Sequence, residues 1–123
     1  MGILKFYGYE YEVSVFSYFK IAMSVRKDED EIEEECFEAV KNIYKNDDIK
    51  VLDVKMQEFK SDKHFTFADV GLDLRIKVTE HTYERAYAEA EKLATPESTP
   101  VGVVFSFCEA YDCERDSQRV VGE

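Results

Sequence analysis

The chain has 123 residues, of which 45% are hydrophobic and 14% aromatic, and its formal net charge at pH 7 is -11. This length and apolar fraction indicate one globular domain with a single core, and they argue against disorder. Because no long uncharged apolar run occurs, we expect neither a transmembrane helix nor membrane binding. The negative net charge argues against direct binding to nucleic acid, since Lys and Arg contacts to phosphates supply most of that affinity.

The N-terminal segment MGILKFYGYEYE has one early Lys and soon becomes acidic. It lacks the basic region, apolar core and small-residue cleavage site of a secretory signal, so we expect a cytoplasmic protein. The chain contains three cysteines, Cys36, Cys108 and Cys113. An odd number without an export signal predicts reduced thiols and no disulfide framework.

The first predicted element is a strand from Tyr9 to Val25, in which apolar residues occupy most odd positions and polar residues most even ones. At roughly 3.3 Å per residue this strand would be long for a small domain. The run Phe16, Ser17 and Tyr18 interrupts the alternation in its middle. We therefore expect a bulge or bend near Ser17.

A helix is predicted next, over residues 28–46. Asp28 is the candidate N-cap, and Glu31 follows at the spacing of a capping box. Apolar residues recur at helical spacing: Ile32, Cys36, Ala39, Val40 and Ile43. These positions predict one buried face on an amphipathic helix.

Two alternating runs on either side of the polar turn SDKH at 61–64 predict a β-hairpin. The first run covers residues 52–57 and the second covers residues 70–78. The two phenylalanines just after the turn lie on odd positions, whereas the later apolar residues lie on even ones. This difference predicts a register change near Ala68 or Asp69.

A second helix is predicted from Thr82 to Ala94, because apolar residues recur there at spacings of three and four and the prolines of TPESTP end the pattern. A final strand is predicted from Val101 to Tyr111. After Asp112 the sequence CERDSQRVVGE is mostly polar, which predicts a loosely held C-terminal tail.

The order strand, helix, strand, strand, helix, strand resembles the ferredoxin-like arrangement, written βαββαβ. This resemblance implies an α+β fold with a four-stranded antiparallel sheet and two helices on one face. We predict a single α+β domain over residues 1–112 and a polar C-terminal tail over residues 113–123. Because this architecture hosts many unrelated functions, the function must be argued from a site.

The residue pattern predicts no enzyme. His64 and His81 lie at opposite ends of the predicted third strand, too far apart to share a metal ion or a catalytic triad. Cys108 and Cys113 are an odd number of residues apart, which places their side chains on opposite faces of a regular strand. The chain has no Gly-rich phosphate loop, and the acidic run DEDEIEEECFE lacks the Gly of a calcium loop. We expect no catalytic residues, no metal site and no cofactor.

Eight of the 27 acidic residues lie in the eleven positions from Asp28 to Glu38, which contain no Lys or Arg. Subtracting these 8 negative charges from the net charge of -11 leaves -3 for the other 112 residues. The helix dipole favours carboxylates in a first turn, so a well-solvated helix start is one interpretation. A few acids satisfy the dipole, however, and eight repel one another, which favours a surface that binds a partner.

We predict a non-enzymatic binding protein whose acidic helix contacts a basic groove or patch of a nucleic-acid-handling protein and inhibits or regulates it. Carboxylates on a rigid helix can imitate phosphates and steer such an association. In size and charge the chain resembles small acidic inhibitors encoded by phages and mobile elements, including anti-restriction and anti-CRISPR proteins. The predicted contact residues are Asp28, Glu29, Asp30, Glu31, Glu34, Glu35 and Glu38.

Phe16 and Tyr18 form a second candidate surface, on the predicted open face of the sheet. Plain packing at a bend is one interpretation of these two rings, and exposure would instead mark a surface for another protein or for self-association. The alternative function is therefore a structural or assembly subunit that self-associates, for example as a homodimer, through the open sheet face or a strand edge. A third alternative, an enzyme or small-ligand sensor, requires a deep pocket with converging polar groups.

Overall fold

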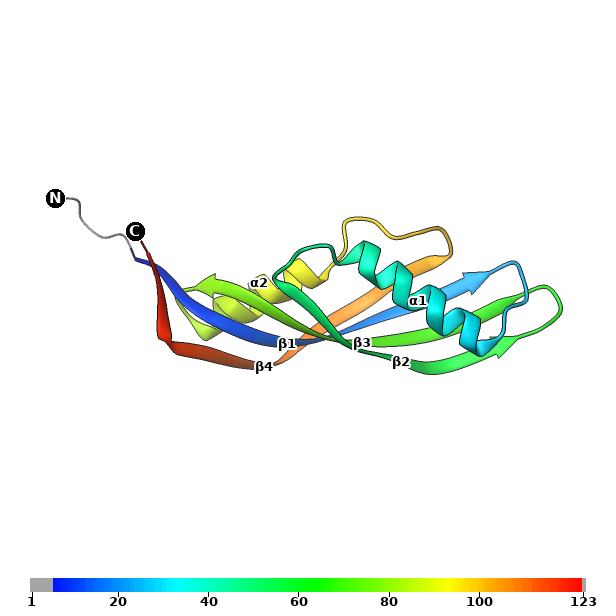
Figure 1. Cartoon of the computed structure of the whole chain (residues 1–123), viewed down its shortest axis with the longest axis horizontal. Coiled ribbons are helices and arrows are strands. Elements are labelled where there is room, and N and C mark those ends of the chain that lie inside the picture. Colours follow the sequence, from blue (N-terminus) through cyan, green and yellow to red (C-terminus); the bar gives the residue numbers. More distant parts are fainter. Residues whose placement is uncertain (1–5, 123) are drawn as a thin grey trace.

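The computed structural model describes residues 6–122, which form an antiparallel sheet of four strands and two helices. The elements are β1 (Phe6–Met23), α1 (Glu29–Ile43), β2 (Ile49–Ser61), β3 (Thr66–Glu80), α2 (Tyr83–Ala94) and β4 (Val103–Gly122). The strands lie in the order β2-β3-β1-β4, and both helices cover the same face of the sheet (Figure 1). The predicted α+β class with a four-stranded antiparallel sheet is therefore confirmed. Residues 1–5 and 123, which the predicted domain and tail include, lie outside the described residues.

The two central strands, β1 and β3, pair without interruption from Tyr9 opposite Glu80 to Met23 opposite Thr66. Alternate side chains of both strands point toward the helices and form the core. Five of them have a relative exposure of 0%: Val13, Val15, Leu72, Leu74 and Ile76. Neither β1 nor β3 therefore has an extra residue of its own in this pairing. The register changes instead against the edge strands: opposite β4 between Tyr18 and Phe19, next to the predicted bulge at Ser17, and opposite β2 between Asp69 and Val70, at the predicted register change near Ala68 or Asp69.

Irregular pairing occurs in the two edge strands instead. Opposite β3, the edge strand β2 has an extra residue at Leu52 and another at Gln57. Opposite β1, the edge strand β4 has extra residues at Ser106 and Tyr111. A residue inserted into an edge strand disturbs one ladder of hydrogen bonds, whereas in a central strand it would disturb two. These four bulges therefore lie where they disturb the fewest hydrogen bonds. Two further register shifts between β1 and β4 occur near the start of β1, at Tyr7 and between Tyr9 and Tyr11.

Ser17 is a fully buried polar residue on the helix-facing side of β1. Its hydroxyl oxygen lies 3.1 Å from the phenol oxygen of Tyr44, and the Tyr44 hydroxyl donates to the carbonyl oxygen of Ala94 at 2.8 Å. Tyr44 is the C-cap of α1, which ends at Ile43 and not at residue 46 as predicted. The Ser17 that interrupts the apolar alternation thus links β1 to the C-terminal ends of both helices.

Both helices begin where they were predicted to begin, with Asp28 and Thr82 as N-caps. The Thr82 side chain accepts a hydrogen bond from the backbone N–H of Arg85 at 3.2 Å. The Asp28 side chain makes no such bond, so its predicted role in a capping box is wrong. Each helix buries one narrow stripe: Ile32, Cys36 and Val40 of α1, and Ala86, Ala90 and Ala94 of α2. The alanine stripe allows α2 to lie close to the sheet.

The last strand, β4, continues beyond its predicted end at Tyr111 as far as Gly122. In this extension Cys113 lies opposite Val13 of β1, and Val120 lies opposite Tyr9. The prediction of a loosely held tail from residue 113 is therefore wrong for its described part. Polar residues are compatible with strand structure here, because one side of this antiparallel sheet has no helix over it.

Candidate functional site

The predicted acidic contact residues lie together on the solvent side of α1. The buried stripe of this helix fixes its orientation on the sheet and turns the carboxylates outward. Six of the seven predicted residues are exposed: Asp28, Glu29, Asp30, Glu31, Glu34 and Glu38. Glu35 is only half-buried, and Glu33, which the sequence analysis did not select, is also exposed. The structure thus presents the predicted acids as one surface, the acidic patch, made of residues 28–31, 33–35 and 38.

Few cations neutralise the acidic patch. Lys27 forms an ion pair with Glu35, and this hydrogen-bonded carboxylate raises the pKa of Lys27. The Lys41 ammonium lies 3.8 Å from a carboxylate oxygen of Glu38. No other acid of the patch has a cation within 4.0 Å among the described residues. Most of the negative charge is therefore available to a partner, and an exposed pair such as Lys41–Glu38 screens little of it.

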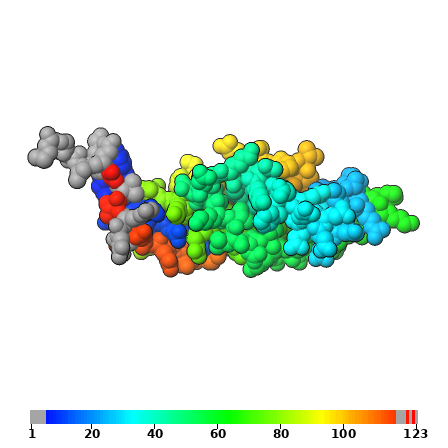
Figure 2. All heavy atoms as spheres, in the orientation of Figure 1, coloured from blue at the N-terminus to red at the C-terminus, as the bar shows by residue number. Residues whose placement is uncertain are grey.

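A groove of about 620 Å³ runs between α1 and the beginning of β2. Figure 2 shows the surface of α1, in cyan to teal, on this side of the molecule. The aromatic ring of Phe37 and the side chain of Leu52 line the groove and are 45% and 54% exposed. Five carboxylates surround these apolar groups: Asp30, Glu33, Glu34, Glu38 and Asp53.

Part of this groove could not be predicted from the sequence. Phe37 follows the buried Cys36 and does not belong to the apolar stripe, so the helical pattern predicts that it is exposed. Leu52 gives no such signal, because it lies in an alternating apolar run. It projects beside α1 because β2 has an extra residue at this position. Asp53 becomes part of the acidic surroundings through the same irregularity.

The second predicted surface, at Phe16 and Tyr18, lies on the open face of the sheet and is half-buried. The ring of Tyr18 stacks on that of Phe107, with centroids 5.5 Å apart and an interplanar angle of 19°. The centroid of Phe16 lies 6.3 Å from that of Phe107. These rings form one cluster on a part of β1 that pairs regularly with β3 and shifts register against β4 next to Tyr18. Phe107 itself is 47% exposed.

Asp69 lies next to this aromatic cluster and is only 9% exposed. Its Oδ1 atom has no hydrogen-bond partner within the part of the chain that the structure describes. Burial, together with the neighbouring Asp69 carboxylate, raises the pKa of Tyr18 to about 12. A buried carboxylate oxygen without a partner is costly.

The structure corrects one prediction about the cysteines. Cys108 lies opposite Ser17 and Cys113 lies opposite Val13, and both β1 residues face the helices. The extra residue at Tyr111 therefore puts both thiols on the same face, not on opposite faces. Burial raises the pKa of all three cysteine thiols, in the case of Cys36 to about 12. A raised pKa keeps a thiol protonated and weakens it as a nucleophile.

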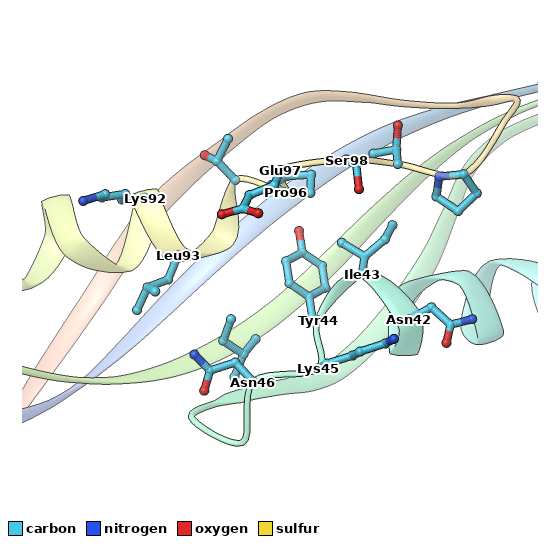
Figure 3. Close-up of a pocket in the computed structure, with 14 residues that line it drawn as sticks. Asn42, Ile43, Tyr44, Lys45, Asn46, Lys92, Leu93, Pro96, Glu97 and Ser98 are labelled. Carbon is cyan, nitrogen blue, oxygen red and sulfur yellow. The ribbon is translucent and has the colours of Figure 1, made fainter.

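A hollow of about 940 Å³ lies where the C-terminal ends of the two helices meet the loop at 95–100 (Figure 3). Its charged groups are Lys45 from the segment after α1, Lys92 from α2 and Glu97 from the loop. Cations near helix C-termini offset the negative end of each helix dipole. Neither His nor Cys lines this hollow. The two lysines therefore have a structural explanation.

Within residues 6–122, no group of three or more His, Cys, Asp or Glu side chains is arranged to hold a metal ion. His64 and His81 flank β3 at its two ends, as predicted. Neither helix of the described chain has the length and apolar character needed to span a membrane. No protein-family model, no curated protein and no solved structure matches this chain.

Proposed function

We propose that this protein is a non-enzymatic binding protein whose acidic patch docks on a basic surface of a nucleic-acid-handling protein and inhibits or regulates it. One observation supports this proposal above the others: exposed carboxylates of α1 surround a groove that holds two exposed apolar side chains, Phe37 and Leu52. A helix start that is merely solvated accounts for the carboxylates but not for these apolar groups beside them.

The two kinds of side chain have different physical roles in such a complex. The carboxylates raise the association rate with a basic surface, and this electrostatic contribution decreases with salt. The apolar groups supply area that is removed from water on binding, at about 25 cal/mol per Å². A rim of charge around an apolar centre is the usual composition of a protein interface. The expected partner thus has cationic groups placed around an apolar contact.

The rigid spacing of the patch supports imitation of nucleic acid. Successive carboxylates stand on one helix that buried side chains hold against the sheet. Because their positions are fixed, little conformational entropy is lost when they meet a row of Lys or Arg side chains. We also propose that the scaffold is ferredoxin-like, because its elements follow the order βαββαβ, and that it presents α1 on one side.

The test compares two variants of the full-length protein, each with the same change in charge. Glu31→Lys/Glu34→Lys alters the acidic patch, and Glu84→Lys/Glu97→Lys alters exposed acids on α2 and the following loop. Each immobilised protein is exposed to lysate from the organism that encodes it, at low and at high salt. We expect the wild type and the α2 variant to retain the same nucleic-acid-binding protein at low salt, and the α1 variant to lose it.

Competition with duplex DNA tests the imitation itself. If the retained partner uses its nucleic-acid site, added DNA displaces it from the immobilised protein. Equal retention by the α1 variant and the wild type would contradict docking through the acidic patch. Retention that depends on the patch but resists DNA would contradict imitation of nucleic acid and leave a simple acidic contact.

A further inference from the structure

The open face of the sheet, on the side without helices, carries opposite charges on its two halves. At one end of the half formed by β2 and β3, the polar side chains are Lys50, Arg75 and Lys77. At the same level of the half formed by β1 and β4, they are Glu12, Asp112 and Glu114. Residues are at the same level when they pair across neighbouring strands. Arg75 lies opposite both Lys50 and Ser14, and Ser14 lies opposite Asp112.

None of these six charged side chains forms an ion pair within 4.0 Å in the described structure. The neighbouring level differs, because the ammonium of Lys55 lies 3.2 Å from Asp73 and 3.9 Å from Asp53. The acids next to the aromatic cluster on β2 and β3 therefore have a cation of their own. The three acids at the end of the face have no cation within 4.0 Å among the described residues.

At the other end of the face, Asp69 of β3 lies directly opposite Lys20 of β1. Their side chains are not within ion-pair distance, and the buried Oδ1 of Asp69 has no partner among the described residues. Between the two charged ends lie the rings of Phe16, Tyr18 and Phe107. The face thus has an aromatic centre on the half formed by β1 and β4, with charges at both ends, and the exposed Glu109 lies opposite Phe16 within this centre.

We propose that a second copy of this chain covers the open face, related by a twofold axis that runs parallel to the strands between β1 and β3. Such a rotation exchanges the two halves of the face. It places Lys50 against the partner's Asp112, Lys77 against the partner's Glu12, and Asp69 against the partner's Lys20. The rings of the aromatic centre, which all lie on β1 and β4, face the partner's β3 and β2 around Gly71 and Lys55. Every contact occurs twice because the interface is isologous.

The direction of the axis follows from the charges. An axis across the strands, through the aromatic cluster, would place Lys50 against the partner's Lys55, which is a contact between like charges. It would also place Asp112 against an aromatic ring, the partner's Phe107. This axis would pair Lys77 with the partner's Asp69, but it would also place Asp73 and Glu109 each against its own copy. The axis along the strands makes one contact between like charges, Asp53 against the partner's Glu109, beside three between unlike charges. Unlike charges across an interface favour the correct pairing and suppress others.

Charge-swapped variants test this homodimer by sedimentation equilibrium of the full-length protein at low salt. Variant A is Lys50→Glu/Arg75→Glu, which makes both halves of the face acidic, and variant B is Asp112→Lys/Glu114→Lys, which makes both halves basic. All four residues are exposed. We expect a dimeric wild type and, for each variant alone, at least about tenfold weaker dimerisation. An equimolar mixture of A and B regains the dimer, because the acidic face of A fits the basic face of B.

The matched control is Arg26→Glu/Lys63→Glu, which makes the same change in charge in two loops away from the face and is expected to leave the dimer intact. Phe107→Arg gives a second test if a double variant does not fold: it places a charge at the aromatic centre and should yield a folded monomer by circular dichroism and sedimentation. A monomeric wild type, a dimer unaffected by A and B, a mixture that stays monomeric, or a dimeric Phe107→Arg variant would each overturn the proposal.

This dimer goes beyond docking through the acidic patch and can fail independently of it. Variants A and B leave the carboxylates of α1 unchanged, and the Glu31→Lys/Glu34→Lys variant leaves the open face unchanged. Loss of the dimer in A with retained partner binding, or the reverse in the α1 variant, therefore identifies which surface carries which role.

Discussion

The hydroxyl of Ser17, in the middle of β1, lies 3.1 Å from the phenol oxygen of Tyr44 at the end of α1, and both side chains are buried. Tyr44 in turn donates to the carbonyl oxygen of Ala94, the last residue of α2. A short polar chain through the core therefore joins one strand to both helices. It also satisfies a carbonyl that the end of a helix leaves without an intrahelical donor.

Removing the Tyr44 hydroxyl should destabilise the protein more than the small size of this group suggests. Tyr44→Phe leaves the Ser17 hydroxyl and the Ala94 carbonyl buried without this partner, which costs about 1–3 kcal/mol in the free energy of unfolding. Urea denaturation followed by circular dichroism measures the change. The double variant Ser17→Ala/Tyr44→Phe should lose less than the sum of the two single variants, because the two groups share one bond. Strict additivity would contradict the link.

Alkaline pH should weaken the fold through two tyrosines. Burial raises the pKa of Tyr44 and, with the Asp69 carboxylate, that of Tyr18 from 10.0 to about 12. A phenol whose pKa is higher in the folded chain makes its full contribution to the free energy of unfolding at pH values below its unfolded pKa. That contribution is lost as the pH rises toward its folded pKa. We therefore expect the free energy of unfolding to fall between pH 10 and about 12.

Urea denaturation at several pH values across this interval measures the slope. Tyr44→Phe and Tyr18→Phe should each reduce it, because each removes one group whose ionisation opposes folding. A slope unchanged in both variants would show that other groups cause the alkaline loss.

Gly71 should not tolerate a side chain, although it lies in the middle of a strand. A Cβ atom at this position would lie 2.6 Å from Cζ of Phe16, whose ring occupies the space above the glycine. Gly71→Ala therefore displaces the ring and should cost about 1–3 kcal/mol in the free energy of unfolding. Adding Phe16→Leu should recover part of this loss, since the shorter side chain leaves room for the methyl group. No recovery would mean that the backbone, not the ring, rejects the methyl group.

Removal of the end of β4 should be costly. Truncation after Tyr111 deletes the segment that pairs with the first part of β1, including Cys113 opposite Val13. It also deletes Arg115, whose guanidinium lies 4.3 Å from the ring centroid of Tyr9. We expect a clear decrease in the melting temperature, and faster hydrogen exchange at the newly exposed edge of β1. A truncated protein as stable as the full chain would show that this segment contributes nothing to the fold.

The central elements could be predicted because their signals are local. Alternation in β1 and β3 marks strands that are buried on one face and solvated on the other, and the stripes of α1 and α2 recur with the helical period. The position of the acidic patch follows from the same stripe, since Ile32, Cys36 and Val40 must face inward. The edge strands give weaker signals, because a polar strand such as the end of β4 has the composition of a loop.

The sequence by itself determined the α+β class, the four strands and two helices, and the outward direction of the carboxylates on α1. Only the tertiary structure decided where the bulges lie, that both Cys108 and Cys113 face the helices, and that Leu52 joins Phe37 beside the acids. It alone also brought Asp69 under an aromatic cluster without a partner for its Oδ1. The physical reason is the sequence distance over which each feature is specified. Periodicity is a property of neighbouring residues, whereas an inserted residue in an edge strand is specified by the register with another strand.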